Sequence, residues 1–264
     1  MTADAPTGQP LPMIFVGHGS PMNTLEFNRW TGAWRNTAES FPKPRAILAV
    51  SAHWYINATA VTQADQPRTI HDFSGFPPEL FAVEYPAPGD TDLVERVAAL
   101  ADPVPVLGDG GSWGLDHGTW SVLVHMYPDA DVPVVQLGID ATKPPSFHLD
   151  LGKSLEPLRH EGVLIFGSGN TVHNLGRMDW NMPDSGTDWA VSFDDAATSI
   201  MTDDPGRVTE LVDHDAYALA APTPDHLLPL FYVAGAASAA GLPASVITDG
   251  CAMGSLSMTS YRAG

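Results

Sequence analysis

The chain has 264 residues, and its hydrophobic content of 44% with 24 glycines and 24 prolines is typical of a globular protein rich in loops. Its formal net charge of −19 argues against nucleic acids and anionic membranes as partners, because both attract cationic surfaces. The sequence has no long apolar run, no basic and apolar leader and no cysteine besides Cys251, so we expect a cytoplasmic protein without disulfides.

In chain order, residues 1–10 predict a flexible tail, and short apolar runs then alternate with helical patterns. The runs that predict strands are residues 13–16, 46–50, 104–107, 132–137, 163–166 and 245–248. Apolar residues at helical spacing predict helices at residues 92–100, 147–158, 187–201 and 227–240. This alternation indicates a central, mainly parallel or mixed sheet covered by helices on both faces. Because no repeat or linker is visible, we expect one α/β domain over residues 11–264.

The stretch "FVGHGSP", residues 15–21, places His18 directly after the first predicted strand and between Gly17 and Gly19. Glycines on both sides allow a tight turn and a close approach of other backbone. A hydrogen-bonded turn histidine would explain one such case, but the pattern recurs along the chain.

Further histidines also follow predicted strands. His53 follows residues 47–52, His117 follows the run at 104–107 and a glycine-rich loop, and His173 follows the run at 164–166. Ligands of open α/β sheets bind beyond the carboxyl ends of the strands, so these imidazoles are expected to converge there. A cluster of imidazoles without cysteines suits zinc, iron, copper or nickel.

A competing motif lies at Gly110–Gly114, where "GGSWG" fits the G-x-S-x-G nucleophile elbow of serine hydrolases. Asp213 or Asp215, with His226, would complete a triad. The elbow needs a helix that begins at the serine, whereas the helical pattern here begins only at Thr119. We therefore disfavour a serine hydrolase.

Six segments in order along nearly the whole chain resemble the class III extradiol ring-cleavage dioxygenases, in the branch similar to 4,5-DOPA dioxygenase. They are "GHGSPMNTLE", "ILAVSAHW", "HDFSGFPPELFAVEYPAPG", "GLDHGTWSVL", "LIFGSGNTVHNL" and "DHLLPLFYVAGAA". The resemblance implies a single α/β domain and non-haem Fe(II), with Zn(II) in some isolated proteins.

Residue by residue, the resemblance implies that His18, His53 and His226 are the metal ligands. His173 would be the acid/base histidine and a possible fourth ligand, especially for zinc, and His117 would be a second catalytic histidine of the pocket. The expected substrate-binding residues are His71, Trp54, Phe73, Phe76 and Trp120.

The function implied by the resemblance is Fe(II)-dependent cleavage of a DOPA-like or related catechol with O2 to a muconic semialdehyde-type product. A small aromatic substrate and O2 are then the partners of a monomer or small homo-oligomer. Two alternatives stay open: a zinc hydrolase that uses the same histidines, with zinc-bound hydroxide as nucleophile, and a non-catalytic binding protein on this fold.

Overall fold

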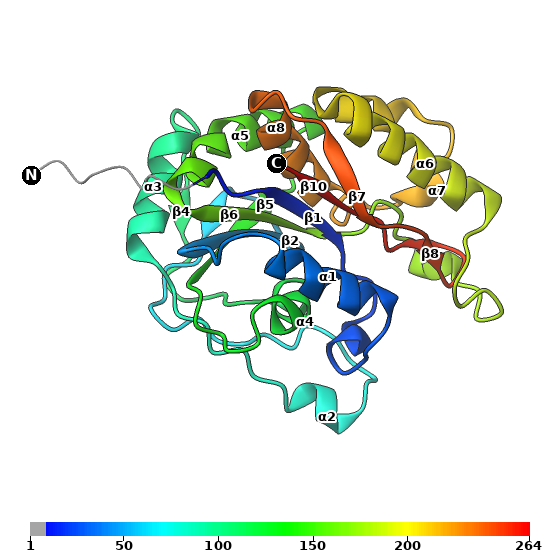
Figure 1. Ribbon diagram of the computed structural model, residues 1–264, viewed down its shortest axis with the longest axis horizontal. Helices are drawn as coiled ribbons and strands as arrows, with labels where there is room; N and C mark the ends of the chain where they lie inside the picture. The colour runs from blue at the N-terminus through cyan, green and yellow to red at the C-terminus, as the bar shows by residue number, and fades with distance from the viewer. Residues whose placement is uncertain (1–8) are drawn as a thin grey trace, which may run out of the picture.

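An eight-stranded mixed sheet forms the centre of the molecule and lies between two layers of helices (Figure 1). The structure is a computed structural model and describes residues 9–264. Of the predicted tail, residues 1–8 lie outside the described residues, and Gln9 and Pro10 are exposed. The sheet has the order β4-β3-β5-β2-β6-β1-β10-β7, and β8 and β9 form a separate pair. The strands are β1 (Met13–Gly17), β2 (Ala46–Ile56), β3 (Ala60–Val61), β4 (Leu107–Gly108), β5 (Val134–Asp140), β6 (Val163–Gly169), β7 (Ala244–Thr248), β8 (Cys251–Ala252), β9 (Leu256–Ser257) and β10 (Ser260–Ala263).

The four central strands, β5, β2, β6 and β1, run parallel to one another. Antiparallel neighbours flank them, with β3 against β5 on one side and β10 against β1 on the other. The central strands are almost continuously apolar because helices cover both of their faces. The expected single α/β domain with a mixed sheet is confirmed.

Alternate side chains of each strand enter two different cores. Met13 and Phe15 of β1 face one core, whereas Ile14 and Val16 face the other. The first core is covered by α3 (Thr91–Ala101), α5 (Pro145–Leu155), α6 (Asp188–Asp203), α7 (Tyr217–Ala220) and α8 (Leu228–Ala239), drawn above and beside the sheet in Figure 1. The second is covered by α1 (Arg29–Glu39), α4 (His117–Met126) and the short α2 (Pro78–Phe81), drawn below it. None of the described helices is long and apolar enough to cross a membrane.

Two parts of the sheet differ from the sequence prediction. The predicted strand at residues 104–107 is reduced to the two residues of β4 at the exposed edge. Pro103 and Pro105 have no amide hydrogen to donate to a neighbouring strand, which explains the loss. β10 was not predicted, since its sequence "SYRA" is not an apolar run, yet it pairs with both β1 and β7.

β2 also extends beyond its predicted end and reaches Ile56. Its ladder with β6 stops at Ser51, and its register with β5 shifts between Val50 and Tyr55. His53 therefore lies inside the strand, at a point where neither ladder is regular. This irregularity leaves the His53 side chain free to turn toward the strand ends.

The segment after β9 lies against the turn that carries His18. A Cβ at Gly17 would come within 2.7 Å of the Met258 backbone, so only glycine fits there. The neighbouring Ser257 and Thr259 hydroxyls each donate a 2.6 Å hydrogen bond to the Asp194 carboxylate of α6. Asp194 thereby holds this segment against the His18 turn.

Asp194 generates a prediction about stability. Burial raises the pKa of this carboxyl to about 6, although the two hydroxyl donors oppose the shift. Because the folded chain holds the proton more tightly than the unfolded chain, stability falls as pH rises from about 4 to about 6. Asp194→Asn removes this charge. The free energy of unfolding of the variant minus that of the parent protein should therefore be about 1–2 kcal/mol more positive at pH 8 than at pH 5. Urea unfolding of both proteins at both pH values measures this quantity. The same difference between variant and parent at pH 5 and pH 8 would contradict the raised pKa of Asp194.

Candidate metal centre and active site

Five histidines from five parts of the chain meet beyond the carboxyl ends of β1, β2 and β6, as the crevice rule predicts. The ring centroids of His18 lie 5.1 Å from His53, 5.8 Å from His117 and 5.4 Å from His226. His53 and His117 are 3.9 Å apart, and the fifth ring, His173, stacks on His226. The imidazoles therefore form one cluster.

The tautomer of His18 follows from its hydrogen bonds. Its Nδ1 lies 3.0 Å from the Ser168 hydroxyl, which itself donates to the Gly118 carbonyl. Since a hydroxyl has one proton and a carbonyl can only accept, the Ser168 oxygen accepts from His18 Nδ1–H. The lone pair of His18 is consequently on Nε2, the nitrogen that faces His53.

One carboxylate orients two further rings. Asp72 Oδ2 lies 3.0 Å from His53 Nδ1, and Asp72 Oδ1 accepts from both His117 Nδ1, at 2.8 Å, and the His117 backbone N–H, at 3.0 Å. Burial alone would raise the pKa of Asp72, but the bonds from His117 and His53 outweigh it and hold the pKa well below its usual range. Asp72 is therefore an anion that fixes Nδ1–H on both imidazoles.

His226 repeats the arrangement through its sequence neighbour, because its Nδ1 lies 2.5 Å from Asp225 Oδ2. Burial and the nearby His53 and His117 lower the pKa of His226 to about 4, although Asp225 opposes the shift. Burial also lowers the pKa of His18, with the surrounding imidazoles adding to it. Four rings, His18, His53, His117 and His226, thus have Nδ1 occupied and leave Nε2 to the cluster.

This donor set fits a divalent transition metal. Histidines that bind metals usually donate their second ring N–H to a carboxylate or another acceptor, and all four rings do so here. The Nε2 atoms of His18 and His53 are 3.2 Å apart. Two nitrogen ligands with bonds of about 2.1 Å would be separated by about 3.0–3.4 Å at octahedral to tetrahedral angles. Ligand atoms of His18, His53 and His117 all lie within 4.8 Å of one another.

His173 differs from the other four rings. It stacks on His226 with a centroid separation of 3.5 Å and an interplanar angle of 3°, and its ring makes no hydrogen bond within residues 9–264. Burial, together with the charge that His226 would carry, lowers the pKa of His173 to about 2. This ring is therefore neutral and free of the tethers that orient its neighbours.

The histidines line one side of a cavity of about 460 Å³. Its other walls are largely apolar, and none of the described residues that line it is a lysine or an arginine. Trp180, on the loop before α6, is 74% exposed at the rim. The apolar side chains of the lining are Pro21, Phe73, Phe76, Leu175, Met178, Trp180 and Leu256.

Of the substrate-binding residues expected from the sequence, Phe73 and Phe76 line this cavity. His71, Trp54 and Trp120 do not. Trp120 is fully buried beside Phe73 and donates its indole N–H to the Ile70 carbonyl. His71 Nε2 lies 2.9 Å from the Val83 carbonyl oxygen, and Trp54 stacks on Trp113. His71 and Trp120 pack on Phe73 and so support the wall from behind.

The sequence interpretation overlooked the groups that orient the rings. These groups are Asp72, Asp225 and Ser168, none of which the sequence analysis identified. A visible signal was present for two of them, because Asp72 directly follows His71 in "HDF" and Asp225 directly precedes His226 in "DH". The serine hydrolase stays disfavoured: α4 begins at His117 rather than at Ser112, and Ser112 is exposed outside the lining of the cavity.

Known proteins share this combination of fold and site. Residues 15–263 match the family model of the catalytic LigB subunit of aromatic ring-opening dioxygenase. The chain is 46% identical over 258 residues to 4,5-DOPA dioxygenase extradiol of Escherichia coli (strain K12), covering 96% of this chain and 95% of the relative. It is 36% identical over 242 residues to 4,5-DOPA dioxygenase extradiol of Beta vulgaris, covering 85% and 86%. A crystal structure of an uncharacterized protein from Escherichia coli K12 matches with a TM-score of 0.83 and 41% identity, covering 96% and 99%.

The fold and these matches define an extradiol dioxygenase, an enzyme that opens aromatic rings. The chain belongs to the family of catalytic LigB subunits of aromatic ring-opening dioxygenases.

The role of Asp72 can be tested through metal affinity. In Asp72→Asn, the amide N–H faces an imidazole Nδ1–H that previously donated to the carboxylate. That imidazole must move its proton to Nε2, and the Nε2 lone pair that faces the cluster is then lost. We expect about a 10–100-fold loss of affinity for Zn²⁺ or Co²⁺, the usual cost of removing such an orienting partner. Competition against a chromophoric chelator measures it. Asp90→Asn, which alters a helix cap at α3, is the matched control. Equal metal affinities of the two variants would contradict the role assigned to Asp72.

Proposed function

We propose that the protein is an Fe(II)-dependent extradiol dioxygenase that cleaves the ring of a DOPA-like or related catechol with O2, giving a muconic semialdehyde-type product. The observation that carries the proposal is the set of four imidazoles whose Nδ1 atoms are tethered and whose Nε2 lone pairs meet at an apolar cavity. Residues 11–264 form the catalytic domain in this proposal. The working enzyme is cytoplasmic, monomeric or a small homo-oligomer, and Zn(II) is able to replace Fe(II) in the isolated protein.

Metal binding is assigned to His18, His53 and His226, following the resemblance to the family. His117 is the rival for the third position, because its ligand atom lies within 4.8 Å of those of His18 and His53. Three protein ligands leave room on the metal for a substrate that binds through two oxygens, whereas four leave less. When bound, Fe(II) supplies the electron transfer between catechol and dioxygen that side chains cannot provide.

Proton transfer is assigned to His173, with His117 as the second catalytic histidine. His173 is neutral, lines the cavity and has no fixed hydrogen-bond partner, so a ring nitrogen is available to accept a proton from a catechol hydroxyl and to return it. His117 Nδ1 is held by Asp72, which leaves its Nε2 as an acceptor beside the substrate. Phe73 and Phe76 supply an apolar wall for the ring.

The direct test is turnover after anaerobic loading with Fe(II). Catechol, 4-methylcatechol and DOPA are added, followed by oxygen. We expect oxygen uptake with the appearance of a yellow product. Hydrolysis of esters or amides without oxygen consumption would support the zinc hydrolase instead. Binding of catechols without either reaction would support a non-catalytic protein and overturn the proposal.

The roles of the individual rings can be separated by measuring metal content and turnover together. His226→Ala should lose metal on dialysis, whereas His117→Ala should retain it. His173→Ala should retain iron and catechol binding but lose about two to four orders of magnitude in turnover, the usual scale for a general acid–base residue.

The exposed His160, which pairs with Glu156, provides the control: His160→Ala should match the parent protein. The reverse pattern, with metal lost from His117→Ala and kept by His226→Ala, would transfer the third ligand to His117. Loss of iron from His173→Ala in step with activity would make His173 a ligand.

A further inference from the structure

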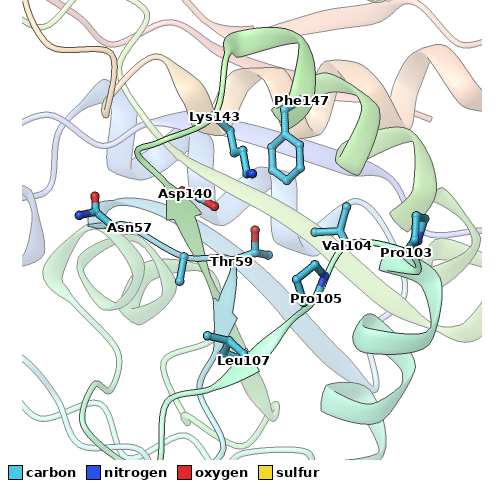
Figure 2. A pocket seen from close by; sticks show the side chains of 10 residues that line it. Asn57, Thr59, Pro103, Val104, Pro105, Leu107, Asp140, Lys143 and Phe147 are labelled. Carbon is cyan, nitrogen blue, oxygen red and sulfur yellow. The ribbon is translucent and has the colours of Figure 1, made fainter.

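A second cavity lies beyond the carboxyl ends of β2 and β5, between the start of α5 and the segment before β4 (Figure 2). Its volume is about 410 Å³, within the range of small-molecule sites. It shares no lining residue with the histidine cavity. Nothing in the reaction proposed above uses it.

Two largely buried residues present oxygens without a protein partner to this cavity. Thr59 is 3% exposed, and its hydroxyl makes no hydrogen bond within the described chain. Asp140 is 6% exposed; its Oδ1 accepts from the Thr142 N–H and hydroxyl, while Oδ2 has no partner among residues 9–264. Both side chains point into the same space in Figure 2. These two oxygens are therefore available to accept hydrogen bonds from a ligand in the cavity.

A cationic group borders the same space from the other side. The Lys143 ammonium lies 5.6 Å from the centroid of the Phe147 ring and forms no ion pair with any described carboxylate. Helix α5 begins directly after it, at Pro145, with no side-chain cap on its first turn. The Lys143 ammonium favours an anionic group at this end of the cavity.

The remaining wall is apolar and is formed by Val104, Pro105, Leu107 and the Phe147 ring. Leu107 is 56% exposed although it belongs to a strand of the sheet. A ligand that covered this wall would remove apolar surface from water.

We propose that this cavity binds an amino acid with an apolar side chain in its zwitterionic form. Its ammonium would donate to Asp140 Oδ2 and the Thr59 hydroxyl, and its carboxylate would pair with Lys143. Its side chain would lie against Val104, Leu107 and Phe147. A ligand with both charges pairs with Asp140 and Lys143 together, whereas a ligand with only one charge pairs with only one of them.

Titration calorimetry of the full-length, metal-loaded protein tests the proposal. The probes are L-leucine, 3-methylbutylamine, which lacks the carboxylate, and 4-methylpentanoate, which lacks the ammonium. We expect L-leucine to bind with a dissociation constant in the millimolar range or below and each analogue to bind at least tenfold more weakly. Asp140→Asn and Lys143→Met should each weaken L-leucine binding at least tenfold. Lys153→Met, on the neighbouring α5 and paired with Asp150 at the surface, should leave L-leucine binding unchanged.

Three results would overturn the proposal. They are no binding of L-leucine by the parent protein at about 20 mM, equal binding by the parent and the Lys143→Met variant, and loss of L-leucine binding in His226→Ala, which would put the ligand in the histidine cavity. Lys143 is exposed, so its replacement keeps the test valid even if Asp140→Asn fails to fold. The test does not depend on whether the protein cleaves catechols.

Discussion

The hydrogen bonds at Nδ1 of His18, His53, His117 and His226 are the constraint on which the site depends. An untethered imidazole exchanges its proton between two nitrogens and rotates, so its lone pair has no fixed direction. Ser168, Asp72 and Asp225 remove that freedom, since each accepts from Nδ1–H and leaves the lone pair on Nε2. The close glycine contacts at the His18 turn and the irregular ladder at His53 serve this arrangement, because they bring the rings within reach of these acceptors.

The same hydrogen bonds set the charge of the site. The chain has a formal charge of −19, yet the cavity wall presents mainly imidazoles and apolar side chains. The two carboxylates behind the rings, Asp72 and Asp225, both have pKa values held below the usual range by their histidine partners, although burial opposes this. Two fixed negative charges behind neutral ligands offset a divalent cation and leave the open side of the metal to the substrate.

The sequence was sufficient for much of the fold and for the position of the site. His18 and His173 could be placed because they follow apolar parallel strands, and the carboxyl ends of such strands form the binding crevice. Ser168 could not be assigned its role, since it lies 150 residues from His18 in the sequence and only the folded chain brings them together. β10 and the shortening of β4 were not predicted for a similar reason. Both depend on pairing partners and proline positions more than on the local apolar pattern. The second cavity depends on unpaired atoms, which no sequence pattern reveals.

The most direct measurement for this account is the tautomeric state of the histidine rings in the metal-free protein at neutral pH. Long-range ¹H–¹⁵N correlation spectra distinguish a protonated Nδ1 from a protonated Nε2 in each imidazole. The account predicts the Nδ1–H form for His18, His53, His117 and His226, with the Nε2 resonances shifting when Zn²⁺ is added. Nε2–H forms at these four positions, or rapid exchange between the two forms, would contradict it.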